Sequence, residues 1–197
     1  MNEILVLYYS KNGSVKEMAS FIARGINSVK GAKALIRTVP EVFPEIKNQK
    51  PSIPDSGSLY ATLDDLRNCS GLALGSATRF GNMAAPLKYF IETASPIWLD
   101  GSLENKAACV FTSSSSLHGG NESTLLSMQI PLFHMGMILL GLPYSLPELT
   151  STKSGGTPYG ASHVSTDKNI NVVTEDEKKL CIAQGIRLAE ISLKLKK

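Results

Sequence analysis

The sequence predicts an α/β fold, in which a parallel sheet of five strands carries helices on both faces. Two observations predict it. Five short apolar runs rich in strand formers alternate with segments whose apolar residues recur at helical spacing. Strands separated by helices build parallel sheets, because each crossover returns the chain over one face. Since no internal repeat or composition shift marks a boundary, residues 1–197 are expected to form one domain.

The N-terminal elements follow this alternation. Residues 3–9 (EILVLYY) predict the first strand. A helix is expected from Ser14, which together with Glu17 matches a capping box, and Gly31 is expected to end it. Residues 32–39 predict the second strand. The apolar residues of the helix share one face: Val15, Met18, Ala19, Ile22, Ala23, Ile26 and Val29.

The middle of the chain continues the pattern. Residues 40–57 hold four prolines and are expected to form a loop. Thr62 is expected to cap a short helix over residues 63–68. Residues 71–75 (GLALG) predict a buried third strand, and residues 84–93 a helix.

Residues 106–112 and 137–142 (MILLGL) predict the fourth and fifth strands. Between them lies a mostly helical segment, residues 123–135, which Pro131 is expected to bend or break. The stretch 143–173 is predicted as a loop, and its length suggests function or oligomer contact.

A C-terminal helix is expected to begin at a second capping box, Thr174 with Glu177, and to run through Lys194. The residues expected on its inner stripe are Ile182, Ile186, Ala189 and Leu193.

Composition and charge restrict the classes of function. An apolar fraction of 43% and a charged fraction of 19% are typical of a globular chain with a core. The net charge of +3 is scattered and forms no basic stripe, so nucleic acid is not expected as a partner. No apolar stretch approaches the roughly 18 residues of a membrane span. With three widely separated cysteines and no signal peptide, a cytoplasmic protein is expected.

Three polar loops follow strand ends, where open α/β sheets bind ligands. The first, residues 10–15 (SKNGSV), combines short hydrogen-bonding side chains, a glycine and a helix N-terminus, which suits a phosphate. It is neither a GxGxxG fingerprint nor a P-loop, and an ordinary capped turn explains it as well.

In the second loop, residues 75–83, Arg79, Phe80, Gly81 and Asn82 lie close together, as expected where backbone donors face the edge of a ring. Alternatively, Arg79 pairs with a surface carboxylate.

The third loop, residues 112–120 (TSSSSLHGG), offers hydroxyls that can line a flat heterocycle. A lone histidine such as His118 is more often a hydrogen-bonded loop residue than a catalyst. For His134 the structural alternative is a partly buried histidine at a helix C-terminus, and for Trp98 a core or interface aromatic. The spacing supports neither a Ser-His-Asp triad nor a metal cluster, so no metal is expected.

Several stretches resemble the WrbA family of flavodoxin-like NAD(P)H:quinone oxidoreductases, nearly end to end and in the same order. They are LVLYYSKNGSVKEMA (5–19), GSATRFGNMAAPLKYF (75–90), SSLHGGNESTLLS (115–127), HMGM with GLPY (134–144) and GGTPYGA (155–161). The resemblance implies a flavodoxin-like, doubly wound sheet, non-covalent FMN and a homotetramer. It also implies two-electron reduction of quinones with NADH or NADPH.

The resemblance also implies roles for individual residues. The first loop would hold the FMN phosphate through Ser10, Lys11, Asn12, Gly13, Ser14 and Val15. The second would contact the isoalloxazine edge through Thr78, Arg79, Phe80, Gly81 and Asn82. The third would line the remaining side of the flavin through Ser113, Ser114, Ser115, Ser116, Leu117, His118 and Gly119. The expected catalytic residue is His134, reaching the flavin from a neighbouring part of the assembly. Trp98 and Asn12 would contact nicotinamide and quinone.

This chain departs from the family pattern at three places. Asn12 stands where many members carry an aromatic residue, and Met135 follows His134 where many have a second histidine. Residues 165–170 replace a glycine-rich segment. The mechanism implied is ping-pong, with both substrates using one place over the flavin.

Two other functions remain open. The first is a one-electron carrier of the flavodoxin type, which the charge of +3 disfavours because such carriers are usually acidic. The second is a non-enzymatic, FMN-binding regulatory protein.

Overall fold

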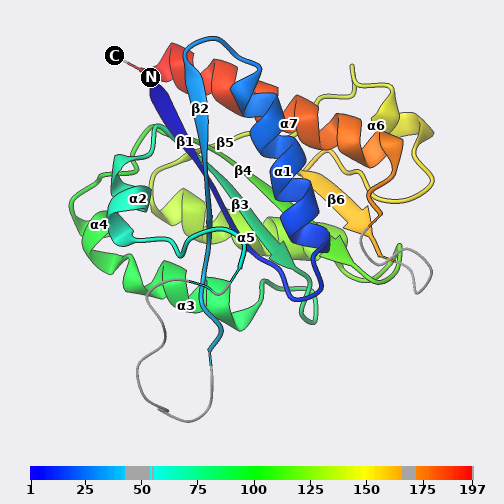
Figure 1. Ribbon diagram of the computed structural model, residues 1–197, viewed down its shortest axis with the longest axis horizontal. Coiled ribbons are helices and arrows are strands. Elements are labelled where there is room, and N and C mark those ends of the chain that lie inside the picture. The colour runs from blue at the N-terminus through cyan, green and yellow to red at the C-terminus, as the bar shows by residue number, and fades with distance from the viewer. Residues whose placement is uncertain (43–53, 55, 166–171, 197) are drawn as a thin grey trace.

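A parallel sheet with the strand order β2-β1-β3-β4-β5 runs through the centre of the molecule (Figure 1). The computed structural model describes residues 1–42, 54, 56–165 and 172–196. A sixth strand, β6, pairs with β4 beyond the end of β5. The strands are β1 (Asn2–Tyr9), β2 (Ala32–Thr38), β3 (Gly71–Ala77), β4 (Ala107–Ser114), β5 (Ile138–Leu139) and β6 (Ala161–Val164).

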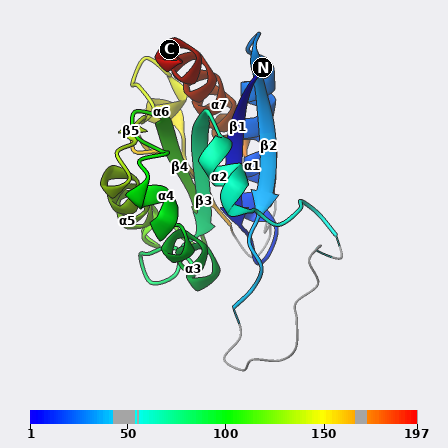
Figure 2. The same ribbon diagram turned by 90° about the vertical axis from the view of Figure 1, so that its left-hand side faces the viewer.

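Helices cover both faces of this sheet, so the predicted architecture is confirmed (Figure 2). One face is covered by α1 (Ser14–Asn27) and α7 (Glu175–Leu195). The helices on the other face are α2 (Leu63–Asn68), α3 (Ala85–Thr93), α4 (Ser95–Leu99) and α5 (Asn121–His134). A short helix, α6 (Glu148–Ser151), lies in the connection that precedes β6.

The two faces have separate cores because successive side chains of a strand point to opposite sides. In β1, Leu5 and Leu7 pack toward α2, α3 and α5, whereas Ile4 and Val6 pack toward α1 and α7. All four are completely buried. The predicted face of α1 is confirmed, except that Val29 lies beyond the end of the helix.

The inner stripe predicted for α7 is partly confirmed. Ala189 is buried and Leu193 packs against the same core, but Ile182 and Ile186 do not belong to it. The packed side is centred instead on Cys181, Gly185 and Leu188. The reason is a close crossing with α1. A Cβ built on Gly185 would lie 2.1 Å from the carbonyl oxygen of Ile22. The two backbones therefore touch, and the packed side of α7 centres on its smallest residue.

Two of the three predicted helix caps are confirmed. Thr62 caps α2, and Thr174 forms a capping box with Glu177 at the start of α7. Ser14 is not the cap of α1. Gly13 occupies that position with φ 98°, and in the described part of the chain no side chain caps the helix. The helix also ends at Asn27, before the expected Gly31.

The fifth strand is much shorter than predicted, and a strand was missed in the segment expected to be a loop. The last contact of this segment with β4 is the hydrogen bond from the amide of Leu140 to the carbonyl of Ala108 at 2.8 Å, and the amide of Leu142 then donates to the carbonyl of Pro158 at 2.9 Å. The chain returns to the same edge as β6, pairing Phe111 to Ser114 with residues 161–164. Pro131 lies inside α5 without ending it. Most of the predicted loop 40–57 lies outside the described residues.

Candidate functional site

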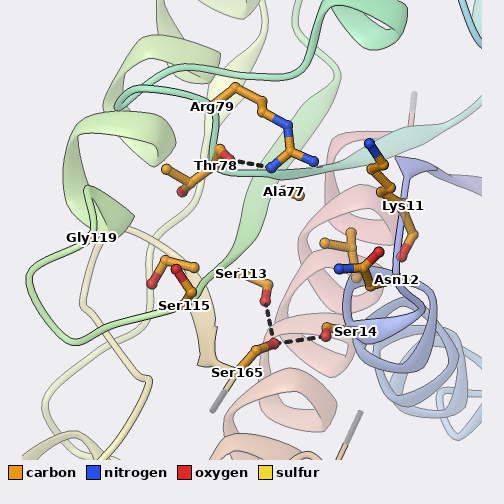
Figure 3. Close-up of a pocket in the computed structure, with 13 residues that line it drawn as sticks. Lys11, Asn12, Ser14, Ala77, Thr78, Arg79, Ser113, Ser115, Gly119 and Ser165 are labelled. Atoms are coloured by element: carbon orange, nitrogen blue, oxygen red, sulfur yellow. Dashed lines mark hydrogen bonds between the residues drawn. The ribbon is translucent and has the colours of Figure 1, made fainter. Parts of the chain in front are cut away.

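A cleft of about 250 Å³ opens where the carboxyl ends of β1, β3 and β4 meet (Figure 3). It brings together residues from all three loops singled out in the sequence. Its lining consists of Ser10, Lys11, Asn12, Ser14, Val15, Ala77, Thr78, Arg79, Ser113, Ser114, Ser115, Gly119 and Ser165. Open α/β sheets bind their ligands at this edge, so the cleft is the candidate functional site.

One wall of the cleft is the turn from β1 into α1. The hydroxyl of Ser10 accepts a hydrogen bond from the amide of Gly13 at 3.1 Å, which closes the turn. The left-handed backbone of Gly13 then directs the chain into α1. The first turn of a helix has amides without intrahelical acceptors and carries the positive end of the helix dipole. This wall is therefore suited to a phosphate.

Three serines meet at the base of the cleft. The hydroxyl of Ser165 lies 2.8 Å from that of Ser14 and 3.3 Å from that of Ser113. Figure 3 shows these three side chains pointing toward one another from three separate segments. Ser165 was not among the predicted site residues, and neither was Ala77. The signal for Ser165 would have been its place directly after a strand, but the sequence did not reveal β6.

A second wall is the loop after β3, the strand between β1 and β4. The amide of Thr78 donates to the carbonyl of Ser113 at 2.9 Å, and the Thr78 hydroxyl lies 3.0 Å from that of Thr124. The Arg79 guanidinium folds back and donates to the carbonyl of Thr78 at 2.9 Å. These contacts fix the position of Arg79 at the opening.

A tight turn follows, closed by reciprocal backbone hydrogen bonds between Arg79 and Asn82 of 2.8 and 3.0 Å. Its central residues, Phe80 and Gly81, have φ of 53° and 75°. Positive φ at both positions is the mark of a type I′ turn. The turn projects Phe80 into solvent, so Phe80, Gly81 and Asn82 do not line the cleft within one chain.

The third wall follows β4. Ser113, Ser114 and Ser115 line it, and the Ser114 hydroxyl donates to the carbonyl of Ser116 at 2.7 Å. Gly119 also lines this wall. The chain packs closely there, since a Cβ built on Gly119 would lie 2.9 Å from the Ser116 hydroxyl. The remaining residues predicted in this loop, Ser116, Leu117 and His118, are exposed and do not line the cleft.

The charge of the cleft favours an anion. Its lining includes two cations, Lys11 and Arg79, and among the described lining residues there is no carboxylate. Nearby, burial raises the pKa of Tyr9, and the adjacent carboxylate of Glu41 raises it further, while Arg79 lowers it. The Tyr9 hydroxyl therefore stays protonated and donates to Glu41 at 3.4 Å.

Trp98 and His134 lie together, but outside this cleft. They border a second hollow of about 450 Å³ between α3, α4 and α5, together with Asn82 from the turn after β3. Trp98 is 52% exposed, so it is not a core aromatic. His134 ends α5 and is exposed, so it is not the partly buried structural histidine of the alternative interpretation.

The described residues do not support a metal site or a reactive cysteine. These contain no group of three or more His, Cys, Asp or Glu side chains placed to hold a metal ion. All three cysteines are unpaired and buried. Burial raises the pKa of Cys69 to about 11 and that of Cys109 to about 12, and it also raises that of Cys181. Thiols this basic are poor nucleophiles at neutral pH. Over the described range, no helix has the length and apolar character needed to cross a bilayer.

The doubly wound sheet, with a cation-bearing cleft at the carboxyl ends of its strands, defines a flavodoxin-like fold. Residues 3–148 match the family described as NADPH-dependent FMN reductase, and the chain belongs to this family.

Similar proteins agree with this assignment. A relative from Acidithiobacillus ferrooxidans, named NAD(P)H dehydrogenase (quinone), is 40% identical over 99% of both chains. A relative of the same name from Syntrophobacter fumaroxidans is 37% identical over 98% of both. The solved structure of a flavodoxin-type, WrbA-like protein from Agrobacterium tumefaciens superimposes with a TM-score of 0.67 over the whole of both chains, at 18% identity. The resemblance to the WrbA family is thereby confirmed.

Proposed function

We propose that the cleft at the ends of β1, β3 and β4 holds FMN, and that the protein, as a single domain, reduces quinones to hydroquinones with NADH or NADPH. The observation that carries the proposal is the convergence of all three predicted loops on one cation-bearing cleft. The family match and the name of the relatives support it.

The cleft fits FMN in the chemistry of its donors. The start of α1 offers a phosphate the hydroxyls of Ser10 and Ser14 and the amides of its first turn. Gly13 does not line the cleft, and its amide bonds to Ser10, so its part is to shape the turn. The loops after the neighbouring strands β3 and β4 add small or hydrogen-bonding residues to the lining, among them Thr78 and Ser115, which suit a flat polar ring.

When bound, FMN would supply the redox chemistry, which is the acceptance of a hydride equivalent from a nicotinamide and the delivery of two electrons to a quinone. Arg79, which lines the cleft, and nearby backbone donors would stabilise negative charge on the reduced ring, in the manner of an oxyanion hole. His134 supplies a proton to the reduced quinone. Trp98 offers a flat face on which both substrates stack, and Asn12 contacts them from the first loop.

The nicotinamide and the quinone bind one after the other at the same position over the flavin, because the sequence contains no separate dinucleotide fingerprint. The resulting kinetics are ping-pong.

The resemblance implies a homotetramer, and the positions of Trp98 and His134 support assembly of more than one copy. Within one chain they border a hollow separate from the cleft, so their proposed roles require a second copy to bring them to a flavin. The same helices expose large apolar side chains, which a neighbouring copy would cover: Tyr89, Leu99, Leu126, Ile130 and Phe133.

Sedimentation of the FMN-loaded protein tests the assembly. Ile130→Asp should release smaller species, whereas Leu195→Asp, at an exposed apolar position on α7, should leave the tetramer intact. A wild-type protein that stays monomeric at high concentration would exclude the assembly and the proposed role of His134.

We place the protein in the cytoplasm, which three buried and unpaired thiols support because such thiols are typical of a reducing compartment.

FMN binding is tested by titrating the apoprotein with FMN and following the quenching of flavin fluorescence. Gly13→Val forces a branched side chain into a left-handed backbone at the proposed phosphate site and should weaken binding at least tenfold. Gly31→Val is the matched control, because Gly31 has φ 93° in the turn before β2, at the far end of α1. Unchanged FMN affinity in Gly13→Val would refute the phosphate assignment.

A further inference from the structure

Two ionisable side chains, Glu177 and His163, are buried together beside the cleft and have no part in the function proposed above. Their side chains are 0% and 1% exposed. The Nδ1 atom of His163, in β6, lies 2.9 Å from Oε2 of Glu177, in the first turn of α7. A buried carboxylate is costly unless it is well hydrogen-bonded, so the partners of Glu177 indicate which segments it holds.

The carboxylate of Glu177 joins three successive segments: the loop before β6, β6 itself and the start of α7. Its Oε2 accepts from the amide of Thr174 at 2.8 Å, which belongs to the capping box of α7. Its Oε1 accepts from the amide of Gly155 at 2.8 Å and from the hydroxyl of Ser154 at 2.9 Å. The same oxygen accepts from the amide of Val164 at 3.2 Å. Glu177 therefore ties β6 and the preceding loop to the start of α7.

Glu177 satisfies a backbone amide of β6 on the side that faces away from β4. The amide of Ser165 donates to Ser114 in β4, so the amide of Val164, one residue earlier, points to the other side of β6. Glu177 accepts that amide. At the beginning of the strand Gln184 bridges β6 and β4, because it accepts from the amide of Ala161 at 2.7 Å and donates to the carbonyl of Val110 at 2.8 Å. A four-residue strand is thus held in register by side chains of α7.

The protonation of His163 follows from its surroundings. Its Nε2 atom is buried and has no hydrogen-bond partner among the described residues. The Nδ1 atom carries a proton that it donates to Glu177, because an ionised carboxylate can only accept a hydrogen bond.

Register in β6 matters because the strand runs directly into the cleft. Ser165 is the next residue, and its hydroxyl meets those of Ser14 and Ser113. A slip by one residue would place Val164 at this position and turn His163 out of the interior.

We propose that His163 and Glu177 are positioning residues for the cofactor, because they fix the register of β6 and thereby hold Ser165 at the base of the FMN cleft. The inference rests on the proposed placement of FMN. Neither residue lines the cleft, so both act through Ser165.

FMN affinity of the full chain, measured by fluorescence quenching, tests the proposal together with the thermal unfolding midpoint. His163→Leu removes the donor and should weaken FMN binding about tenfold, the equivalent of one hydrogen bond to a charged group. His163→Asn keeps an amide donor near the position of Nδ1 and should restore affinity to within about threefold. If His163→Leu fails to fold, His163→Val serves instead.

Two controls separate positioning from general stability. Thr62→Ala removes the cap of α2 and should lower the unfolding midpoint without changing FMN affinity. In a Ser165→Ala background, His163→Leu should weaken binding by less than about twofold, because the residue through which it acts is already lost.

The proposal is overturned if His163→Leu lowers the unfolding midpoint but binds FMN like the wild type. It is also overturned if the effects of His163→Leu and Ser165→Ala simply add. A wild-type chain that binds no FMN would instead refute the proposed function.

Discussion

Replacing the buried carboxylate of Glu177 with an amide should destabilise the protein by an amount that depends on pH. Burial by itself raises the pKa of Glu177, but hydrogen bonds from His163 and from the amides of Thr174 and Gly155 outweigh it and lower the pKa to about 2, from 4.5. At about 1.4 kcal/mol for each pKa unit, this difference corresponds to roughly 3 kcal/mol of stability contributed by the ionised group.

The sign of the pH dependence follows from the direction of the shift. Because the pKa is lower in the folded protein, the contribution is fully present above about pH 4.5 and is lost as the pH falls toward 2. The Glu177→Gln variant has no ionisable group at this position. It should therefore be less stable than the wild type by roughly 3 kcal/mol at pH 7, and the gap should narrow steadily below pH 4.5.

Urea denaturation of the FMN-free protein between pH 7 and pH 3, followed by circular dichroism, measures this gap. Glu175→Gln is the matched control. It lies in the same turn of α7, but its side chain is 79% exposed and pairs with Lys178 at the surface. A gap for Glu177→Gln that stays constant from pH 7 to pH 3 would refute the reasoning, as would an equal loss of stability in Glu175→Gln.

Three further predictions concern packing and turnover. Gly185→Ala places a Cβ 2.1 Å from the carbonyl oxygen of Ile22 and should lower stability by about 1–3 kcal/mol in the same denaturation assay, whereas an unchanged midpoint would contradict the close crossing of α1 and α7. Initial rates with NADH and benzoquinone should give parallel double-reciprocal lines, and intersecting lines would exclude a shared place over the flavin. Trp98→Ala should raise KM for both NADH and benzoquinone, and His134→Ala should mainly lower kcat. A change in KM for one substrate alone would contradict the stacking role of Trp98, and an unchanged kcat would contradict the proton-donating role of His134.

Local sequence patterns predicted much of the fold correctly. The apolar run at residues 3–9 and the spacing of Val15, Met18 and Ile22 identified β1 and the buried face of α1. The capping box at Thr174 located the start of α7. Such features are predictable because a strand or an amphipathic helix is encoded by residues a few positions apart.

The sequence also predicted which loops line the cleft. The three loops that line it were found from their composition and their place after strands, and parallel strands bring such loops to one edge. Capping of α1 was predicted wrongly because the side chain of Ser14 turns to Ser165 instead. A hydroxyl competes for partners across the molecule, and the sequence does not show which partner it meets.

The sequence by itself thus determined the alternation of strands and helices and the three loops of the cleft. Only the tertiary structure decided which side of α7 packs, where the fifth strand stops, and that Ser165 reaches the cleft. Each of these depends on contacts between distant segments: Gly185 against Ile22, β6 against β4, and Glu177 holding the outer side of β6. Four residues with no marked local preference become a strand only where a sheet edge and a buried carboxylate satisfy their amides.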